Sequence, residues 1–214
     1  MRYKAAIFDL DGTLVDSLAD LADAINYALK QLNQPTRSTE FFRAVIGDGI
    51  RTTISRALEP EEQGLVDIAV DKMREKYAQI CLDNTKAYKG LTEVVAELYE
   101  KGVKLAVLTN KDQKMARKIV NHFFADYFAV VAGTTSLKPA KPDPQKTLQV
   151  LDKLGVMPGQ VIFFGDSSVD IQTAKACKIF AVGVSWGLKS KEELAKAGAD
   201  IIVAEPSQLL SFFV

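Results

Sequence analysis

The sequence predicts an α/β protein with a doubly wound, Rossmann-like parallel sheet and an inserted all-helical domain. From residue 86 onwards, short apolar runs alternate with amphipathic stretches, as in successive βαβ units. Residues 17–84 instead show helical spacing of apolar side chains and no candidate strand. A strand-free stretch of about 70 residues does not fit a regular βαβ progression. We therefore expect a core of residues 1–15 and 85–214, with a helical domain of residues 16–84 inserted into it.

The first expected strand, residues 5–8, is apolar throughout, which is typical of a strand buried on both faces. It ends in Asp9 and Asp11, at the edge where open parallel sheets bind ligands. Two carboxylates on one face repel each other unless a cation or a proton relieves them, and Mg2+ would do so. Gly12 allows a sharp turn and a close approach of its N–H to an anion. An Asp-Gly turn with Asp11 as a helix cap is the simpler alternative.

The helical domain is expected to contain four helices. Ser17 is a plausible N-cap for the first of them, and Asp20 adds a negative charge to its first turn. The glycines at 47 and 49 break the pattern after the second helix, and Pro60 ends the third. The expected helices span residues 17–33, 41–46, 50–58 and 65–82.

The second part of the chain is expected to complete the sheet through right-handed crossovers. Each apolar run is followed by a helical stretch, and several of these stretches end in glycine. The expected strands are residues 103–108, 127–132, 161–164, 179–184 and 201–203. The expected helices are residues 91–101, 113–123, 145–154, 169–177, 191–197 and 207–213.

Polar residues follow one of these later strands directly. Thr109 and Asn110 end the strand at 103–108, and their hydroxyl and amide are good neutral donors to a phosphate oxygen. Simple capping of the following helix is the alternative, and for these two residues alone it is the more common role.

A lysine and two further aspartates complete the candidate site. Lys141 lies directly before the helix that starts near Pro144, and its charge can meet a phosphoryl group and the carboxylate of the first strand. Lys138 competes for that role. Asp166 ends an apolar strand, and Asp170 falls one helical turn later, so both are candidate metal ligands.

Charge and cysteine content exclude several classes of partner. Lys and Arg together number 27, as do Asp and Glu, so no long-range attraction to nucleic acid or to an anionic membrane is expected. Cys81 and Cys177 lie in apolar segments without a CxxC or Cys/His cluster, which argues against a zinc site or a disulfide framework. No leader-like segment and no apolar run of about 18 residues is present, and we expect a cytoplasmic protein.

Four motifs occur in a fixed order along the chain. They are Asp9-Leu-Asp11-Gly-Thr13, Thr109-Asn110, Lys141-Pro-Asp-Pro144 and Gly165-Asp-Ser-Ser-Val-Asp170. This order resembles the four signatures of the haloacid dehalogenase-like superfamily, and the resemblance spans essentially the whole chain. The helical insertion is similar to the cap of the phosphoglycolate phosphatase-like branch. The resemblance implies a phosphatase that uses Mg2+ to hydrolyse a small phosphorylated metabolite.

The resemblance also implies a role for each matching residue. Asp9 is the nucleophile that forms an aspartyl-phosphate, and Asp11 protonates the leaving oxygen and then activates water. Thr109 and Asn110, like the Gly12 backbone, bind phosphate oxygens. Lys141 neutralises the nucleophile and the phosphate together.

The implied metal site uses the same strand ends. Asp9 and Asp166 hold Mg2+ through their carboxylates, Asp11 through its backbone carbonyl, and Asp170 supports the metal or its waters. In the cap, Arg43, Asp48, Gly49 and Arg51 are candidate substrate contacts, although the break at 47–49 is equally compatible with a simple turn between helices.

Several alternative functions share this core. A β-phosphoglucomutase-like phosphosugar mutase would return the phosphoryl group to the sugar, but such enzymes resemble Asp-Gly-Val where this chain has Thr13. Pyrophosphatase and nucleotidase activities use the same machinery, whereas dehalogenases lack the second aspartate. A binding module without chemistry is disfavoured because all four motifs are intact. A monomer and a homodimer are both compatible with the sequence.

One position departs from the family pattern. Relatives usually carry Ala-Gly before the strand at 179–184, and this chain has Cys177-Lys178. A helix C′ position favours glycine because it requires a left-handed backbone. We therefore expect Lys178 to be mildly strained, by about 1 kcal/mol, unless the turn differs.

Overall fold

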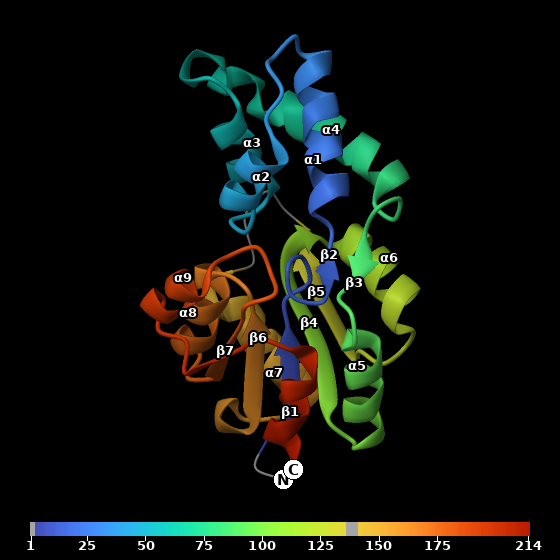
Figure 1. Cartoon of the computed structure of the whole chain (residues 1–214), viewed down its shortest axis with the longest axis vertical. Helices are drawn as coiled ribbons and strands as arrows, with labels where there is room; N and C mark the ends of the chain where they lie inside the picture. Colours follow the sequence, from blue (N-terminus) through green and yellow to red (C-terminus); the bar gives the residue numbers. More distant parts are fainter. Residues whose placement is uncertain (1–2, 136–140) are drawn as a thin grey trace.

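The computed structural model describes residues 3–135 and 141–214. Figure 1 shows a lower body built around a parallel sheet and a group of helices above it. The chain passes twice between these two parts, and the described chain begins and ends at the foot of the body.

The sheet of the lower body has six strands in the order β5-β4-β1-β6-β7-β8, and all neighbours are parallel. The strands are β1 (Ala5–Phe8), β4 (Lys104–Asp112), β5 (Val130–Thr134), β6 (Val161–Gly165), β7 (Phe180–Val184) and β8 (Ile201–Val203). The first strand therefore lies in the middle, between β4 and β6. The chain builds the sheet outward from β1 in both directions, and the predicted doubly wound α/β fold is confirmed.

Helices cover both faces of the sheet because successive strand side chains point to opposite sides. Ala6 and Phe8 face one core and Ala5 and Ile7 the other, and all four are fully buried. The first core includes side chains of α5 (Leu91–Glu100), α6 (Gln113–Phe124) and the 3₁₀ helix η3 (Pro206–Phe213). The second includes side chains of α7 (Pro144–Leu154), α8 (Ser168–Ala176) and α9 (Lys191–Lys196). A short turn, η2 (Pro158–Gln160), precedes β6.

Two strand boundaries differ from the prediction. The expected strand at 127–132 was placed too early: Phe128 precedes β5, and its ring packs edge-on against Phe8 and Phe124, with ring centroids 6.0 and 5.7 Å apart. The strand expected at 103–108 continues as β4 to Asp112, but its pairing with β5 shifts register between Leu108 and Asp112. Such irregularities re-aim side chains and are common beside functional sites.

The turn after α8 agrees with the prediction. Lys178 has a backbone φ of +57°, in the left-handed region that favours glycine. The chain thus places a lysine at a glycine-type position just after the end of a core helix.

The upper part of Figure 1 consists of the helices α1 (Leu18–Gln31), α2 (Thr39–Val45), α3 (Ile50–Ala57) and α4 (Val66–Ile80), with the short turn η1 (Pro60–Leu65) before α4. We call this group the helical lobe. The chain enters it through β2 (Val15–Asp16) and leaves through β3 (Lys86–Ala87), which pair antiparallel with each other. These two-residue strands are too short to leave a sequence pattern. The division into a core and a cap domain stays a prediction.

A buried carboxylate joins the two crossings between the body and the helical lobe. Asp20, in the first turn of α1, is fully buried and accepts hydrogen bonds from the backbone N–H groups of Asn84 and Thr85. The Asn84 amide and the Thr85 hydroxyl also donate to it, at 3.0 and 2.7 Å. Asp20 therefore fixes the returning segment to the start of the outgoing helix.

Replacing this carboxylate should destabilise the protein. We expect Asp20→Ala to lower the free energy of unfolding by about 3 kcal/mol, because it leaves buried N–H donors without an acceptor. Asp23→Ala, on the exposed side of the same helix, serves as the matched control and should cost well under about 1 kcal/mol. Urea unfolding of both variants measures the difference. Equal costs would show that Asp20 contributes nothing beyond an ordinary helical residue.

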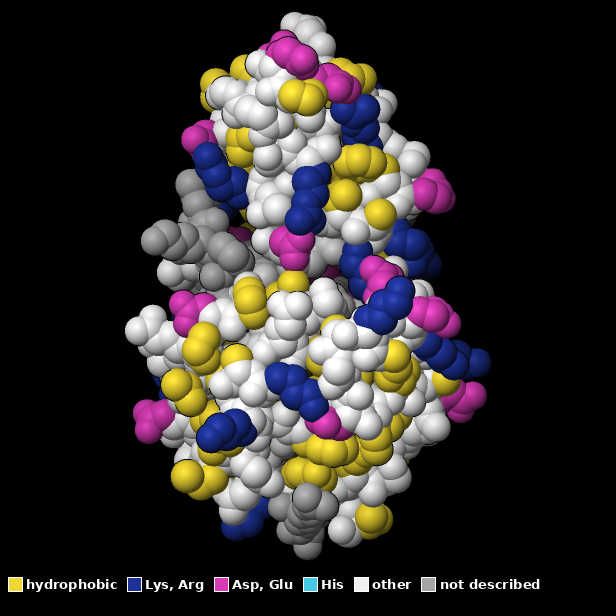
Figure 2. Space-filling model, turned by 90° about the vertical axis from the view of Figure 1, so that its left-hand side faces the viewer, with side chains coloured by type: hydrophobic (Ala, Val, Ile, Leu, Met, Phe, Trp, Pro, Cys, Tyr) yellow, Lys and Arg dark blue, Asp and Glu magenta, His cyan; other side chains and the backbone are white. Residues whose placement is uncertain are grey.

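The outer surface carries charges of both signs. Figure 2 shows Lys and Arg interspersed with Asp and Glu over the face that it presents, without a broad field of one sign. Within the described ranges, no helix is both long enough and apolar enough to span a bilayer.

Candidate active site

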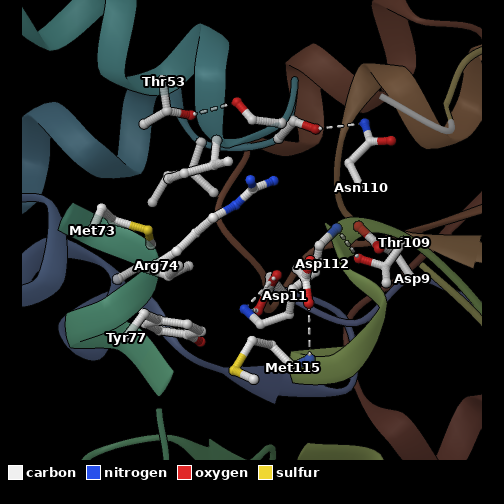
Figure 3. Close-up of a pocket in the computed structure, with 16 residues that line it drawn as sticks. Asp9, Asp11, Thr53, Met73, Arg74, Tyr77, Thr109, Asn110, Asp112 and Met115 are labelled. Atoms are coloured by element: carbon white, nitrogen blue, oxygen red, sulfur yellow. Dashed lines mark hydrogen bonds and ion pairs between the residues drawn. The ribbon is translucent and has the colours of Figure 1, made fainter. Parts of the chain in front are cut away.

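The candidate site is a cavity of ≈ 170 Å³ between the carboxyl edge of the sheet and the helical lobe (Figure 3). Asp9 and Asp11, which follow β1, form part of its floor together with residues 109–112 from the irregular end of β4. The loop before α3 and one face of α4 form the rest of its wall. The cavity thus lies where the parallel-sheet rule predicts a ligand.

Three buried carboxylates meet next to this cavity. Ligand oxygens of Asp9, Asp166 and Asp170 all lie within 4.8 Å of one another. Burial, followed by the charge of Asp170, raises the pKa of Asp9 well above its usual range, and burial and both neighbouring carboxylates do the same to Asp166. Three carboxylates this close together repel one another when all are ionised, unless a cation neutralises them. Such a compact set of oxygen ligands suits a hard divalent cation. The residues present therefore fit such an ion.

Lys141 supplies the ammonium group of this cluster. Its Nζ lies 2.8 Å from Oδ1 of Asp9 and 2.6 Å from Oδ1 of Asp170. Burial alone would lower the pKa of Lys141, but the Asp170 and Asp9 charges raise it above its ordinary value. One ammonium cannot balance three carboxylates, so the ionised cluster retains negative charge. The competing candidate Lys138 lies outside the described residues.

Close packing fixes the position of Asp166. The Leu188 N–H donates to its Oδ2 at 2.7 Å, and the Thr13 hydroxyl donates to its Oδ1 at 3.2 Å. Gly12 has a φ of +86°, and a Cβ on Gly12 or on Gly187 would overlap Asp166. Both glycines are therefore required by the close approach of the backbone to this carboxylate. The sequence assigned no role to Gly187 or Leu188, which follow β7 and lie outside the four motifs.

Asp11 has partners different from those of Asp9. Lys111 Nζ donates to both of its carboxylate oxygens, at 2.7 and 3.0 Å, and the Ser17 hydroxyl donates to Oδ1 at 2.5 Å. Ser17 occupies the N-cap position of α1, as predicted, but its side chain makes no cap hydrogen bond, and Asp16 accepts the Leu18 N–H instead. The hydroxyl is engaged with Asp11, so the helix start contributes to the site.

Lys111 is a site residue that sequence reasoning missed. Burial would lower the pKa of its ammonium, but Asp11 and Tyr77 raise it above the ordinary value. The ammonium also lies 4.5 Å from the ring centroid of Tyr77, over the ring face. Its position directly after Thr109-Asn110 was the available signal, but a lone lysine at a strand end is usually a solvated surface group.

Thr109 and Asn110 line the cavity, as expected. The Asn110 amide spans three segments: its Nδ2 donates to the carbonyls of Gly47 and Lys141, and its Oδ1 accepts from the Lys141 N–H at 2.8 Å. The Thr109 hydroxyl accepts from the Lys111 N–H at 3.2 Å. Asn110 thus positions the lysine segment and contacts the helical lobe, and phosphate binding by both residues stays a prediction.

The four candidate substrate contacts in the helical lobe differ in whether they line the cavity. Gly49 lines the cavity. The side chains of Asp48 and Arg51 instead form ion pairs with other residues of the lobe. The carbonyl of Arg43 accepts a hydrogen bond from Lys189 at 2.9 Å. Of the four, only Gly49 is among the described residues that line the cavity, and the loop at 47–49 does reach the site.

A carboxylate cluster with a buried lysine, at the carboxyl edge of a doubly wound sheet, is typical of the active site of an α/β enzyme. The comparisons with known proteins specify that class further. The family model of the haloacid dehalogenase-like hydrolases matches residues 6–184, and the chain belongs to this family.

Similar proteins cover nearly the whole chain. A phosphoglycolate phosphatase from Haemophilus influenzae (strain 86-028NP) is 33% identical over 219 residues, covering 98% of each chain. One from Mannheimia succiniciproducens is 34% identical over 218 residues, covering 98% of this chain and 97% of its own length. A solved structure from Lactobacillus delbrueckii subsp. bulgaricus superposes with a TM-score of 0.92 at 31% identity, covering 100% of this chain and 99% of that one. The chain is accordingly an enzyme of the phosphatase type.

Proposed function

We propose that this enzyme is a Mg2+-dependent phosphatase that hydrolyses a small, phosphoglycolate-like phosphorylated metabolite through an aspartyl-phosphate. The observation that carries the proposal is the placement of Asp9. Its carboxylate lines the cavity, pairs with Lys141 and lies beside the carboxylates of Asp166 and Asp170. A nucleophile, a neutralising charge and a hard-cation site therefore meet at one point.

The chain's own residues can carry both half-reactions. A carboxylate oxygen of Asp9 attacks phosphorus, the bond from phosphorus to the leaving oxygen breaks, and Asp11 gives that oxygen its proton. Water then attacks phosphorus, loses a proton to Asp11, and releases phosphate and the free Asp9 carboxylate. Lys111 and Ser17 hold the Asp11 carboxylate in place. Lys141 offsets the negative charge that collects on the nucleophile and the phosphoryl group.

Asp9, Asp166 and Asp170 are the side chains that would hold Mg2+, together with the backbone carbonyl of Asp11. The bound ion supplies charge neutralisation for the phosphoryl oxygens. The narrow fit of Asp166 between Gly12 and Gly187 supports a site whose geometry is fixed in advance.

The cavity supports a small substrate and a covering role for the helical lobe. Its volume of ≈ 170 Å³ is below the roughly 300–1,000 Å³ of pockets for drug-sized ligands. Residues 16–84 contribute the loop at 47–49 and one face of α4 to its wall. We propose that these residues form a cap domain that encloses the substrate above the core of residues 1–15 and 85–214.

Phosphate release from a panel of phosphomonoesters in the presence of Mg2+ tests the proposal. The panel includes phosphoglycolate, sugar phosphates, a nucleotide and pyrophosphate. We expect the highest kcat/KM on a small ester. Failure to turn over any ester would overturn the phosphatase proposal, and an isomerised sugar phosphate with little free phosphate would identify a mutase.

Metal dependence gives a separate test. We expect Mg2+ to raise the melting temperature, because an ion that binds only the folded state stabilises it by about 2.7 kcal/mol at 100 times its Kd. Chelation with EDTA should lower activity by about 100-fold or more, and Mg2+ should restore it. Asp166→Asn should lose most of the Mg2+-induced thermal shift. A wild-type shift that the variant reproduces in full would exclude Asp166 as a ligand.

The remaining proposals concern the cellular compartment, the oligomeric state and the partners of the protein. Both cysteines are free and buried, which supports a reducing, cytoplasmic compartment. We propose a monomer or a homodimer that needs neither nucleic acid nor a membrane as a partner.

A further inference from the structure

An arginine of the helical lobe extends into the cavity, and no carboxylate of the described residues pairs with it. Figure 3 shows the Arg74 side chain running from α4 into the middle of the pocket. Its Nε is buried and has no hydrogen-bond partner among the described residues. The arginines of the lobe that do pair with carboxylates, in the described ranges, are Arg37, Arg51 and Arg56. A buried guanidinium donor without an acceptor is costly unless a ligand supplies one.

A second polar group without an acceptor among the described residues lies beside it. Tyr77 is one helical turn further along α4, so the two side chains share a face of the helix. The Tyr77 hydroxyl is buried and lines the same cavity. Its neighbour Lys111 can only donate to it, and no acceptor for its own proton is found in the described part of the chain. Two unsatisfied polar groups on one helix face, both exposed to one cavity, form a two-point recognition site.

The surrounding wall limits what this pair can bind. Apolar side chains make up most of the wall near α4, including Leu21, Ile50 and Met73. They offer no further donors. A carboxylate, with two oxygens and one charge, matches one guanidinium and one hydroxyl. A second phosphate, with three oxygens and up to two charges, fits less well, because the other donors of the lining are engaged: the Thr53 hydroxyl donates to backbone carbonyls and the Lys111 ammonium to Asp11.

We propose that Arg74 and Tyr77 are specificity-determining residues that bind a carboxylate on the leaving alcohol of the substrate. The inference rests on the proposed phosphatase function and adds to it which side chains select the substrate. Arg74 donates to the carboxylate oxygens, and the Tyr77 hydroxyl donates to one of them. The phosphoryl group of the same molecule lies at the floor of the cavity, against Asp9.

Two matched esters test the proposal: phosphoglycolate and ethyl phosphate, which has a methyl group in place of the carboxylate. Arg74→Gln should lower kcat/KM for phosphoglycolate by about 10- to 100-fold and for ethyl phosphate by less than about 3-fold. Tyr77→Phe should lower it by about 3- to 10-fold for phosphoglycolate only. Lys72→Gln, on the same helix but not lining the cavity, is the control. Ethane-1,2-diol bisphosphate measures the response to a second phosphate.

Calorimetric binding of phosphonoacetate and of methylphosphonate, with Mg2+ present, repeats the comparison without catalysis. Arg74→Gln should raise the Kd of phosphonoacetate by about 10-fold or more and leave that of methylphosphonate nearly unchanged. Equal losses for both esters, or for both phosphonates, would show that Arg74 acts on the phosphoryl group and would overturn the proposal. A stronger effect on the bisphosphate than on phosphoglycolate would overturn the carboxylate assignment. If wild type hydrolyses no ester, the phosphatase proposal fails, and the phosphonate Kd ratio still decides the role of Arg74.

Discussion

Replacing Asp9 by asparagine is expected to lower kcat by on the order of 10³-fold or more while leaving the fold intact. The amide has nearly the same shape as the carboxylate, but its oxygen is a poor nucleophile, so the aspartyl-phosphate cannot form. The substitution also removes one of the three crowded carboxylates. We therefore expect the variant, in the absence of divalent cations, to melt at the same temperature as wild type or higher. Phosphate release and thermal unfolding, measured on the same preparation, test both statements.

Asp16→Asn is the matched control for this variant. Asp16 lies in the same stretch of the chain, is exposed, and caps α1 through its side chain, which asparagine can also do. It should retain activity within about 2-fold and stability within about 0.5 kcal/mol. Full activity of Asp9→Asn would exclude Asp9 as the nucleophile. A large loss of stability in Asp9→Asn would show that the carboxylate is needed for folding, and the loss of activity would then have another explanation.

The sequence was sufficient to predict the fold class because the same pattern of an apolar run followed by polar residues recurs along the chain. Each buried strand is an apolar run, and the polar residues appear where the run stops, as in Phe8-Asp9 and Phe164-Gly165-Asp166. Parallel strands then bring those ends to one edge without further information. The structure places Asp9, Asp166 and Asp170 within one cluster and Lys141 against it, and the roles of these residues stay predictions.

What the sequence could not predict depends on contacts between distant segments. Lys111 and Ser17 both contact Asp11, and neither contact follows from local spacing. Ser17 occupies an N-cap position, where a hydroxyl usually bonds the helix backbone, but the nearby carboxylate is a stronger acceptor. Gly187 is required only because Asp166 approaches it from another strand. Arg74 is one of many charged residues on an amphipathic helix, and only the cavity distinguishes it.

Replacing Lys141 by methionine should reduce both activity and stability. Methionine keeps most of the side-chain volume but removes the ammonium that lies 2.8 Å from Asp9 and 2.6 Å from Asp170. Because it leaves buried carboxylates without their partner, we expect the free energy of unfolding to fall by about 3 kcal/mol without divalent cations. Activity should fall by about 10²- to 10³-fold, since one preorganised charge next to the phosphoryl group is lost.

Added Mg2+ separates this effect from simple loss of packing. A divalent cation bound among the carboxylates replaces part of the missing positive charge, so Mg2+ should recover more stability in Lys141→Met than in wild type. Lys175→Met is the control, because Lys175 pairs with Asp200 on the surface at 2.5 Å, where an ion pair contributes about 1 kcal/mol or less. Urea unfolding of wild type and of both variants, each with and without Mg2+, gives the values to compare. Only a lysine that neutralises a cation site can be replaced in part by a bound cation. Similar losses of unfolding free energy in the two variants, or no extra recovery of it with Mg2+ in Lys141→Met, would therefore contradict the idea that Lys141 balances the carboxylate cluster.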